Sequence, residues 1–540
     1  MHITSVATKA YPDQQFGTSG LRKRTQVFMQ HYYIHNVIQS IFDSLKGFEG
    51  KTLIIGGDGR YLNSEAIQIA IKIAVANGFG TIIVGRNGWM STPALSHLIN
   101  KYEAFGGIIF TASHNPGGKD GDFGIKYDDS NGAPAPLSLT SKISERTKGI
   151  DRFWWADIPD LDLSVINEYT FDQAVVKVIN PVTDYAEYMA EIFDFEAIQK
   201  LFASGFTMTF DALNGITGPY AKYIFEEQLG AAQGTVVHGK PLPDFGGCHP
   251  DPNLVYAKDL VDSMFKPETK DFAAASDGDG DRHMILAPNL FINPADSLAI
   301  LTEYLELIPF YKGKMYGVAR SMPTAPVVDD VAVSKKIPLY VTPTGWKFFA
   351  NLLASKKVAV CGEESFGAGS FHVMEKDGIW AILAWLNIIA KTHKKPQELT
   401  YELWTQYGRT YRLRHDYEGV DSGAAQEMFK ALASKLPNLT GTKMGQLQIK
   451  EAKVFTYTDP ITHEKASNQG IIVTFSGNAS VVFRISGTGT VGATVRMYFA
   501  KKEKELDAVP AEVLAPLILT ANTLLQTKKY LGLDAPTSIT

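Results

Sequence analysis

Short apolar runs recur along the chain, and many of them end in a loop rich in glycine and small polar residues. The runs at 52–55, 81–84 and 107–110 have the length and β-branched content that are typical of buried strands. Apolar positions within 37–45 and 64–77 recur at the spacing of amphipathic helices. Because strand, glycine-rich loop and helix alternate, the pattern predicts a mainly parallel α/β sheet in the first part of the chain.

The same alternation returns twice further along the chain. After Asn180-Pro181, a predicted helix at 183–202 and a predicted strand at 206–210 open a second α/β unit. A third unit begins near Asn293-Pro294, with predicted strands around 316–319 and 357–360. We therefore expect two more domains of the same class.

The pattern changes beyond His393-Lys394-Lys395-Pro396, where consecutive strands are predicted at 470–475, 480–485 and 493–499. Such a succession is typical of an α+β domain with an antiparallel sheet. The expected domains are residues 1–180, 181–293, 294–396 and 397–540. Each contains one apolar strand that leads into a Gly/Ser/Asp loop, and four such loops would form one site between four domains.

The composition narrows the class of protein. A chain of 540 residues is too long for one hydrophobic core, and 45% hydrophobic with 20% charged residues is ordinary for a globular protein. A net charge of −5 with a pI near 6.2 argues against a general nucleic-acid binder. We expect no nucleic-acid partner.

Cysteine content and hydropathy bear on the compartment. Cys248 and Cys361 are far apart in sequence and offer neither a disulfide framework nor paired metal-ligand spacing, which fits a reducing compartment. The N-terminal stretch 1–15 has no apolar core of a signal peptide, and the longest apolar stretch, around 379–389, is too short to cross a bilayer. We expect a soluble, cytoplasmic protein without a membrane partner.

The stretch Thr-Ala-Ser-His-Asn-Pro-Gly-Gly at 111–118 presents a serine at the end of a predicted strand. The Asn-Pro-Gly-Gly tail forces a turn, because proline fixes φ and glycine accepts positive φ. Ser113 would thus face a substrate, with His114 beside it. An isolated Ser-His pair of this kind is more often an ordinary polar turn, and four further stretches favour the functional interpretation.

The stretch Asp277-Gly-Asp279-Gly-Asp281 places three carboxylates at alternate positions, with glycines that let the backbone curl around one point. Three close carboxylates repel one another unless a divalent cation neutralises them. An EF-hand is excluded, because Arg282 and Pro288 occupy the positions that require glycine and glutamate. Three carboxylates with room for a further oxygen ligand favour Mg²⁺.

The glycine-rich stretch 486–492 contains the pattern GxGxxG. A dinucleotide site would need a helix after the glycines, but the alternating residues 493–499 predict a strand, and no lysine follows Gly492 as in a Walker A loop. Hydroxyl groups, free backbone N–H groups and the nearby Arg484 and Arg496 favour a phosphate-binding loop instead.

Four weaker signals each keep a structural alternative. The stretch 362–365 offers Glu363 and Ser365 to sugar hydroxyls, or begins a helix with acidic residues. The loop at 342–347 contacts sugar or is a plain turn with a packed Trp346. The stretch 16–24, with Arg22, is an anion-binding loop or a solvated basic turn. Lys376 is a surface lysine, a phosphate ligand, or an acid/base with a lowered pKa.

In order along the chain, these stretches resemble the α-D-phosphohexomutase superfamily, and within it the phosphoglucomutases. The motifs are GTSGLRKR (17–24), TASHNPGG (111–118), DGDGDR (277–282), GEESFG (362–367) and RISGTGTVGATVR (484–496), with TPTGWKFF (342–349) and EKDG (375–378) in addition. The resemblance runs from Ala10 to the C-terminus. It implies an α/β protein of four domains in a heart shape, with three similar α/β domains containing mixed sheets and a C-terminal α+β domain.

The resemblance also implies a reaction and its residues. Ser113 would carry a phosphoryl group, and Mg²⁺ would be held by Asp277, Asp279, Asp281 and a phosphoserine oxygen. Glucose 1-phosphate would be converted to glucose 6-phosphate through glucose 1,6-bisphosphate. Arg22, His114, Lys126 and Lys376 would surround the transferring group, and which of Lys376, His114 or Arg22 moves the proton stays open. The other implied substrate-binding residues are Arg282, Thr344, Gly345, Glu363, Ser365, Arg484, Ser486, Gly487, Thr488 and Arg496.

Several alternatives remain beside this interpretation. A mutase for mannose or N-acetylated sugar phosphates is disfavoured by GEESFG, although side activities stay open. A non-catalytic scaffold relative should show damage in the serine or metal loop, and both loops are intact. A phosphatase using the same serine would release free phosphate. We expect phosphosugar partners and a monomer or weak dimer.

Overall fold

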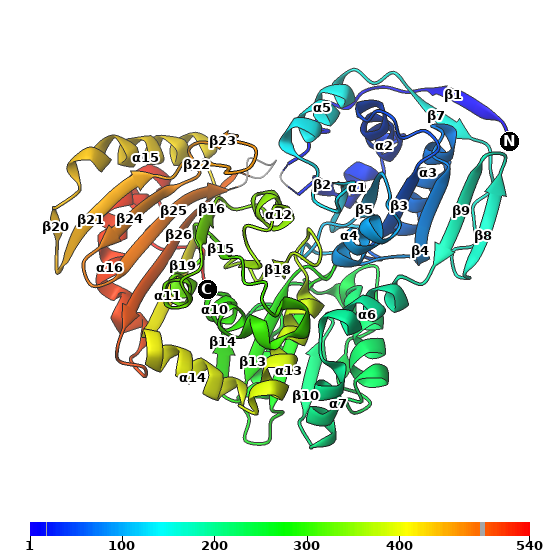
Figure 1. Ribbon diagram of the computed structural model, residues 1–540. Coiled ribbons are helices and arrows are strands. Elements are labelled where there is room, and N and C mark those ends of the chain that lie inside the picture. Colours follow the sequence, from blue (N-terminus) through cyan, green and yellow to red (C-terminus); the bar gives the residue numbers. More distant parts are fainter. Residues whose placement is uncertain (18, 487–491) are drawn as a thin grey trace.

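The computed structural model describes residues 1–17, 19–486 and 492–540 as four units arranged in an arc (Figure 1). The first unit, in blue and cyan, and the last, in orange and red, lie at the two ends, with the second and third between them. Three units are α/β and the fourth contains an antiparallel sheet, as the resemblance implies. The predicted fold class is confirmed.

The first unit has a seven-stranded mixed sheet in the order β2-β6-β5-β3-β4-β9-β8. Strands β5, β3, β4 and β9 run parallel, while β6 and β8 pair antiparallel to their neighbours. Alternate residues of β3 enter different cores: Leu53 and Ile55 pack with helices α2 and α3, and Ile54 packs with α4. The elements are β1 Ile3–Ala7, β2 Leu21–Arg24, α1 Thr25–Phe28, α2 Tyr33–Ser44, β3 Thr52–Gly57, α3 Asn63–Ala76, β4 Thr81–Trp89, α4 Thr92–Lys101, β5 Gly106–Phe110, β6 Asp122–Asp129, α5 Leu137–Lys148, β7 Arg152–Ala156, β8 Asn167–Phe171 and β9 Ala174–Ile179.

The second unit has a five-stranded mixed sheet in the order β11-β10-β12-β13-β14. The prediction of one helix over 183–202 is wrong, because two helices, α6 and α7, separate at Phe193 and Asp194. Asp194 accepts a hydrogen bond from the Ala197 N–H and so begins α7 as its N-cap. The elements are α6 Pro181–Ile192, α7 Phe195–Ala203, β10 Met208–Asp211, α8 Thr217–Ala221, η1 Lys222–Gln228, β11 Val236–Val237, η2 Phe245–Gly247, α9 Lys258–Met264, β12 Phe272–Ser276, β13 His283–Ala287 and β14 Leu290–Ile292.

The third unit has a four-stranded sheet in the order β16-β15-β17-β18, covered by long buried helices. Helix α13 is apolar around its circumference and is buried from Gly378 to Ala390, which identifies the longest apolar stretch as a core helix. The elements are α10 Pro294–Tyr304, η3 Leu305–Leu307, η4 Pro309–Tyr311, β15 Val318–Ser321, α11 Val327–Lys335, β16 Leu339–Thr342, α12 Trp346–Ala354, β17 Val360–Gly362, β18 Ala368–Ser370, α13 Gly378–Thr392 and α14 Pro396–Tyr407.

The fourth unit has a seven-stranded sheet in the order β20-β21-β24-β25-β26-β19-β27, with antiparallel pairing throughout the described strands. Helices α15 and α16 cover one face. The elements are β19 Arg409–Val420, α15 Ser422–Lys435, η5 Leu436–Asn438, β20 Lys443–Met444, β21 Leu447–Val454, β22 Tyr457–Thr458, β23 Lys465–Ala466, β24 Ile471–Phe475, β25 Ala479–Ser486, β26 Ala493–Glu503, α16 Pro510–Leu525, α17 Thr527–Leu531 and β27 Ser538–Ile539.

The four loops that carry the motifs share one position in the fold. Each connects a strand to the next strand, with which it pairs antiparallel: β5 to β6, β12 to β13, β17 to β18, and β25 to β26. Among the described residues, the serine and metal loops meet at the Ser113–Asp277 hydrogen bond, and the metal and sugar loops meet at the bridge between Arg282 and Gly367.

The first three units share packing, whereas the fourth is more separate. One hydrophobic core runs from α4 through the second unit to α13 and α14. The fourth unit has its own core and meets the third through the small cluster Met322, Val482 and Tyr498. Across residues 1–17, 19–486 and 492–540, no helix has both the length and the apolar content that a bilayer crossing requires.

Candidate active site

Ser113 lies in the loop between β5 and β6 with its side chain turned to the second unit. Its φ is +52°, a left-handed conformation that L residues other than glycine, asparagine and aspartate seldom adopt. Its N–H donates to Thr111 Oγ1 at 2.7 Å, and its carbonyl accepts from Arg60 Nη2 at 2.8 Å. Its hydroxyl donates to Asp277 Oδ2 at 2.7 Å. The loop therefore fixes the hydroxyl against the acidic loop.

His114 connects the serine to the metal-loop arginine. Nδ1 lies 3.3 Å from Ser113 Oγ, and Nε2 lies 3.5 Å from Arg282 Nη2. Because an arginine can only donate, Nε2 is the acceptor, and Nδ1 carries the proton that points to Ser113. Burial, reinforced by the charges of Arg282 and Arg22, lowers the pKa of His114 well below its ordinary value. Arg282 is in turn anchored by Asp251 at 3.1 Å.

The carboxylates of Asp277, Asp279 and Asp281 meet as the spacing predicts. All three are buried, and one oxygen from each lies within 4.8 Å of the others. The next element is the strand β13 and not a helix, which agrees with the rejection of an EF-hand. Burial and the neighbouring carboxylates raise the pKa of Asp277 and Asp279.

The triad fits a hard divalent cation. Among the described residues, Asp279 Oδ1 and Asp281 Oδ1 are buried and accept no hydrogen bond, and the Ser113 hydroxyl contacts the third carboxylate, Asp277. Buried carboxylate oxygens without donors are costly unless a cation binds them. Asp277, Asp279 and Asp281 could thus hold Mg²⁺ and leave a position for an oxygen on Ser113.

An ion pair that the sequence analysis did not assign supports the serine loop and the metal loop. Asp58 and Arg60 are fully buried, with Asp58 Oδ2 2.9 Å from Arg60 Nη2. Thr111 Oγ1 lies 2.7 Å from Asp58 Oδ2 and 3.0 Å from Asp279 Oδ2, so it bridges the two loops. A signal existed: the pair lies in the glycine-rich stretch 56–60 at the C-terminal end of β3, at the same sheet edge as Ser113.

Lys376 reaches the triad from the third unit. Its Nζ lies 3.1 Å from Asp281 Oδ2. Burial acts to lower the pKa of Lys376, but Asp281 and Glu363 outweigh it and raise the pKa above its ordinary value. For Asp281 burial acts to raise the pKa, but Lys376 and Arg282 lower it below its ordinary value. A charged Lys376 suits phosphate binding.

The neighbours of Lys376 tie three units together. Glu375 forms a buried ion pair with Lys126 on β6, and Asp128 Oδ1 lies 3.5 Å from Lys126 Nζ. Asp377 accepts from the Tyr185 hydroxyl of α6 at 2.7 Å and begins α13 as its N-cap. Lys126 is therefore placed next to the site with acidic partners of its own, and Glu375 is a partner that sequence analysis missed.

The loop between β17 and β18 is a turn, so the alternative that it begins a helix is wrong. Glu363 is buried and accepts from the Ser365 hydroxyl at 3.2 Å. Burial raises the pKa of Glu363. Glu364 is directed elsewhere, since it accepts from the Ser321 hydroxyl at 2.9 Å. The side chains of Glu363 and Ser365 are thus paired on one side of the turn.

The loop before α12 combines both interpretations offered for it. Trp346 is packed and donates to the Met374 carbonyl at 3.0 Å, which agrees with the alternative of a plain turn with a packed tryptophan. Thr344 Oγ1, however, is buried without a hydrogen-bond partner among the described residues, and Gly345 has a φ of +126°. A hydroxyl in this state is available to a ligand.

Residues 21–24 of the basic stretch form strand β2, and Arg22 turns toward Asp279 and Asp281. Arg24 is exposed, and Lys23 lies 3.8 Å from Asp13. Burial lowers the pKa of Arg22, against the attraction of Asp279 and Asp281. The Nε of Arg22 is buried and donates to no residue that the structure describes. Arg22 therefore fits the anion-binding alternative.

The predicted phosphate-binding residues lie on the fourth unit. Arg484 on β25 pairs in register with Arg496 on β26, and Arg496 pairs in register with Asp416 on β19. Asp416 also holds Arg414, at 3.0 Å, a cation that the sequence analysis did not assign and that the alternation of Arg412, Arg414 and Asp416 could have signalled.

The structure describes only part of the predicted phosphate-binding loop at 486–492. Ser486 ends β25, whereas Gly487 and Thr488 lie outside the described residues. Among the residues that are described, no hydrogen bond or ion pair joins Arg484, Ser486 or Arg496 to the serine or metal loop. The structure thus assembles the serine, metal and sugar loops, and presents the arginine pair separately on the facing unit.

The arrangement has the parts that phosphoryl transfer requires. A positioned hydroxyl lies against a carboxylate cluster suited to a metal, and Arg22, Arg282 and Lys376 provide positive charge around it. Such a reaction depends on positioning and charge neutralisation more than on covalent help from the protein.

Comparison with known proteins identifies relatives along the whole chain. Residues 13–153, 183–289 and 293–407 match the patterns of phosphoglucomutase/phosphomannomutase alpha/beta/alpha domains I, II and III, and residues 409–537 match the phosphoglucomutase-1 C-terminal domain. The phosphoglucomutase of Rhizobium radiobacter is 51% identical over 541 residues, covering 100% of both chains. Phosphoglucomutase-1 of Bos taurus is 44% identical, again over 100% of both.

A solved structure agrees with these relatives. The open form of the exocytosis-sensitive phosphoprotein pp63/parafusin, a phosphoglucomutase from Paramecium, superposes with a TM-score of 0.94. It is 41% identical and covers 100% of this chain and 99% of its own. The likeness therefore extends to all four units.

Proposed function

This chain belongs to the phosphoglucomutase/phosphomannomutase family, and we propose that it interconverts glucose 1-phosphate and glucose 6-phosphate. It is an isomerase of the phosphohexomutase class. The observation that carries the proposal is the hydrogen bond from Ser113 Oγ to Asp277 Oδ2, which joins the nucleophile to the carboxylate cluster.

The proposed reaction uses Ser113 as a phosphoryl carrier. The 6-hydroxyl oxygen of glucose 1-phosphate forms a bond to the phosphorus of phosphoserine, the Oγ–P bond breaks, and the hydroxyl proton is released. The product, glucose 1,6-bisphosphate, then turns in the site. Ser113 Oγ next bonds to the phosphorus at the 1-position, the O1–P bond breaks, O1 takes up a proton, and glucose 6-phosphate leaves.

The proposed metal is Mg²⁺, held by Asp277, Asp279, Asp281 and an oxygen on Ser113. When bound it supplies positive charge to the oxygens of the transferring group. Arg22, His114 and Lys376 surround that group, and Arg282 fixes His114 through the contact at Nε2. Lys126 supports the position of Lys376 through the ion pair with Glu375.

The proposed sugar and phosphate contacts come from two facing units. Glu363 accepts hydrogen bonds from sugar hydroxyls, and Ser365 donates to them. Thr344 and Gly345 contact the sugar from the adjoining loop. Arg484, Ser486, Gly487, Thr488 and Arg496 hold the phosphate that does not react. Contact with both units would exclude water from phosphoserine, which protects it from hydrolysis.

The test is conversion of glucose 1-phosphate to glucose 6-phosphate with Mg²⁺ and trace glucose 1,6-bisphosphate, with free phosphate measured alongside. We expect conversion without phosphate release. Release of phosphate without glucose 6-phosphate would identify a phosphatase, and no reaction would leave a scaffold or a mutase for another sugar. Parallel assays with mannose 1-phosphate measure the breadth of the sugar range.

We also propose the compartment, the partners and the oligomeric state of the protein. The two cysteines are unpaired, with Cys361 buried and Cys248 exposed, which agrees with a reducing compartment such as the cytoplasm. The proposed partners are phosphosugars, with no nucleic acid or membrane, and the proposed state is a monomer or weak dimer.

A further inference from the structure

Phe245 is buried without joining a hydrophobic cluster of the described residues. Its side chain is 1% exposed, yet it belongs to none of the clusters that the described residues form. The loop around it, residues 242–250 of the second unit, is largely exposed, and we call it the clamp loop. Phe245 has a φ of +53°, which is costly for a bulky residue. The ring must therefore pack against something other than an apolar core.

The ring packs against the two loops that carry the serine and the metal ligands. A Cβ placed on Gly117, in the serine loop, would lie 2.8 Å from Phe245 Cδ2, and one on Gly278, in the metal loop, would lie 3.1 Å from Phe245 Cζ. The ring also covers Arg60, whose guanidinium carbon lies 5.1 Å from the ring centre. Because Arg60 Nη2 donates to the Ser113 carbonyl, Phe245 supports the serine through Arg60.

The backbone of the clamp loop is hydrogen-bonded to the same two loops. The Pro243 carbonyl accepts from the N–H of Gly118, in the serine loop, at 2.9 Å and from the N–H of Tyr61 at 2.8 Å. The Pro250 carbonyl accepts from the N–H of Gly278, in the metal loop, at 3.2 Å. The clamp loop is thus bound to the serine loop near one end and to the metal loop at the other, with the ring between them.

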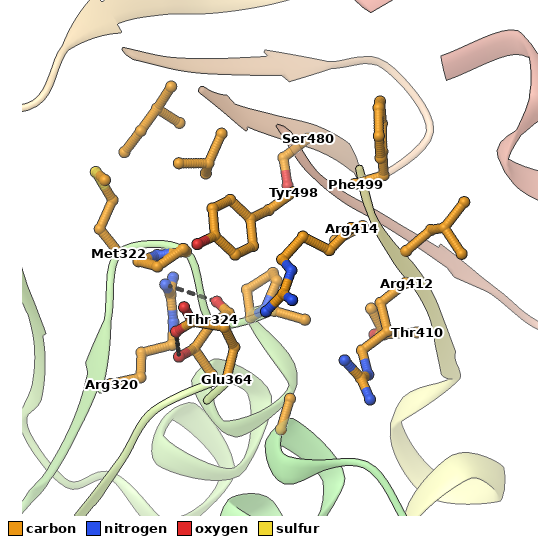
Figure 2. A pocket seen from close by; sticks show the side chains of 18 of the residues that line it. Arg320, Met322, Thr324, Glu364, Thr410, Arg412, Arg414, Ser480, Tyr498 and Phe499 are labelled. Carbon is orange, nitrogen blue, oxygen red and sulfur yellow. Dashed lines mark hydrogen bonds between the residues drawn. The ribbon is translucent and has the colours of Figure 1, made fainter. Parts of the chain in front are cut away.

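The clamp loop lies outside the pocket between the third and fourth units (Figure 2). This pocket has a volume of about 680 Å³, and Glu364 and Tyr498 line it from the two units. Arg282 and Ser365, which are proposed to contact the phosphosugar, also line it, so the pocket belongs to that site. None of the residues 242–250, all of which the structure describes, is part of the lining. A change in the ring should therefore affect the alignment of the loops rather than the binding of the sugar.

We propose that Phe245 is a positioning residue for phosphoryl transfer, and that the clamp loop holds Ser113 in place against the metal loop. The inference rests on the proposed function, because it concerns the same serine. The hydrogen bond between Ser113 and Asp277 joins two different units, and the clamp loop adds backbone hydrogen bonds and a packed ring to that junction. Such alignment governs the rate, because a misplacement of about 1 Å costs about 10²-fold.

The first test replaces the ring and measures turnover. Phe245→Leu keeps an apolar side chain of shorter reach and should lower kcat about 10-fold or more, with an unchanged KM for glucose 1-phosphate. Phe265→Leu, the same change at an exposed position of the second unit, should leave both constants unchanged. Circular dichroism checks that both variants are folded. An unchanged kcat in Phe245→Leu, or a rise in KM in place of a fall in kcat, would overturn the proposal.

Hydrogen exchange tests the same contact without turnover. The amides of Gly118 and Gly278 donate to the clamp loop, so Phe245→Leu should speed exchange in 111–121 and 277–283 by about 10-fold. Exchange in the sheet of the fourth unit, at 471–475, should stay unchanged. Equal exchange in Phe245→Leu and wild type, or faster exchange throughout the chain, would contradict a positioning role.

Gly117→Ala disturbs the contact from the serine loop, and it replaces the first variant where Phe245→Leu does not fold. The added methyl group would press on the ring of Phe245 and on the Pro243 carbonyl. We expect a lower kcat and faster exchange in the same two loops. Gly149→Ala, at a position with open space around it, is the matched control and should behave as wild type. Wild-type kcat in Gly117→Ala would count against the proposal.

Failure of the proposed function is a separate outcome. If the wild type does not convert glucose 1-phosphate, the mutase proposal is wrong, and the exchange measurement alone decides whether the clamp loop holds the serine loop against the metal loop. If the wild type converts it and Phe245→Leu is equally fast, the mutase proposal stands and the role of Phe245 is refuted.

Discussion

Ser113 Oγ donates to Asp277 Oδ2 across 2.7 Å, although 164 positions separate the two residues in the chain. The two side chains come from different units, each at the end of a hairpin connection. The site therefore depends on how the first unit docks on the second, and both loops can be tested separately.

Replacing Ser113 by alanine removes the proposed phosphoryl carrier. We expect Ser113→Ala to lose at least about 10³-fold in kcat, because removal of a nucleophile leaves only the binding and electrostatic contributions. The Tm should change by no more than a few degrees, since the side chain is small and lies in a loop. Ser263→Ala, a change of the same type on α9, is the control, and full mutase activity in Ser113→Ala would rule out the phosphoserine mechanism.

Breaking the pair beneath the loops should destabilise the first unit. Arg60→Met leaves the buried carboxylate of Asp58 without its cation, and we expect a loss of about 3–5 kcal/mol in the free energy of unfolding. Urea denaturation measures this loss. Lys200→Met breaks an exposed pair with Glu196 and should cause no measurable change. Equal effects of the two variants would contradict the structural role of Arg60.

Metal binding should appear as stabilisation. Mg²⁺ at about 100 times its dissociation constant should stabilise the wild type by about 2.7 kcal/mol, measured as a rise in Tm. Asp279→Asn should remove most of that rise and be at least as stable as wild type in EDTA, because one repelling charge is gone. Asp259→Asn, an exposed change on α9, should keep the full response. An unchanged Mg²⁺ response in Asp279→Asn would remove this residue from the metal site.

Asp296 should make stability depend on pH. Burial raises the pKa of Asp296 to about 6, from 3.8, so the folded chain holds this proton more tightly than the unfolded chain. This contribution is favourable below pH 4 and is lost as the pH rises through 6, by about 3 kcal/mol in total.

The test compares Asp296→Asn, which cannot titrate, with wild type. Relative to wild type, the free energy of unfolding of Asp296→Asn should rise by about 3 kcal/mol between pH 4 and pH 7. Asp259→Asn is again the matched control, with a difference that does not vary with pH. A constant difference between Asp296→Asn and wild type over that range would show that Asp296 has an ordinary pKa in the folded chain.

The sequence by itself determined the local features. The class of each unit, the strands that lead into the four loops, and the convergence of Asp277, Asp279 and Asp281 follow from residue type and short spacing, because a strand and a glycine-rich turn fix their own geometry. The helix at 183–202 was predicted as continuous, since periodicity does not reveal where an aspartate will act as an N-cap.

Only the tertiary structure decided the contacts between units. The buried pair of Lys126 with Glu375, the support of Ser113 by Arg60, and the raised pKa of Lys376 each depend on charges brought from distant parts of the chain. Electrostatic energies depend on burial and on every neighbouring charge, and both are set by the packing of units rather than by sequence spacing.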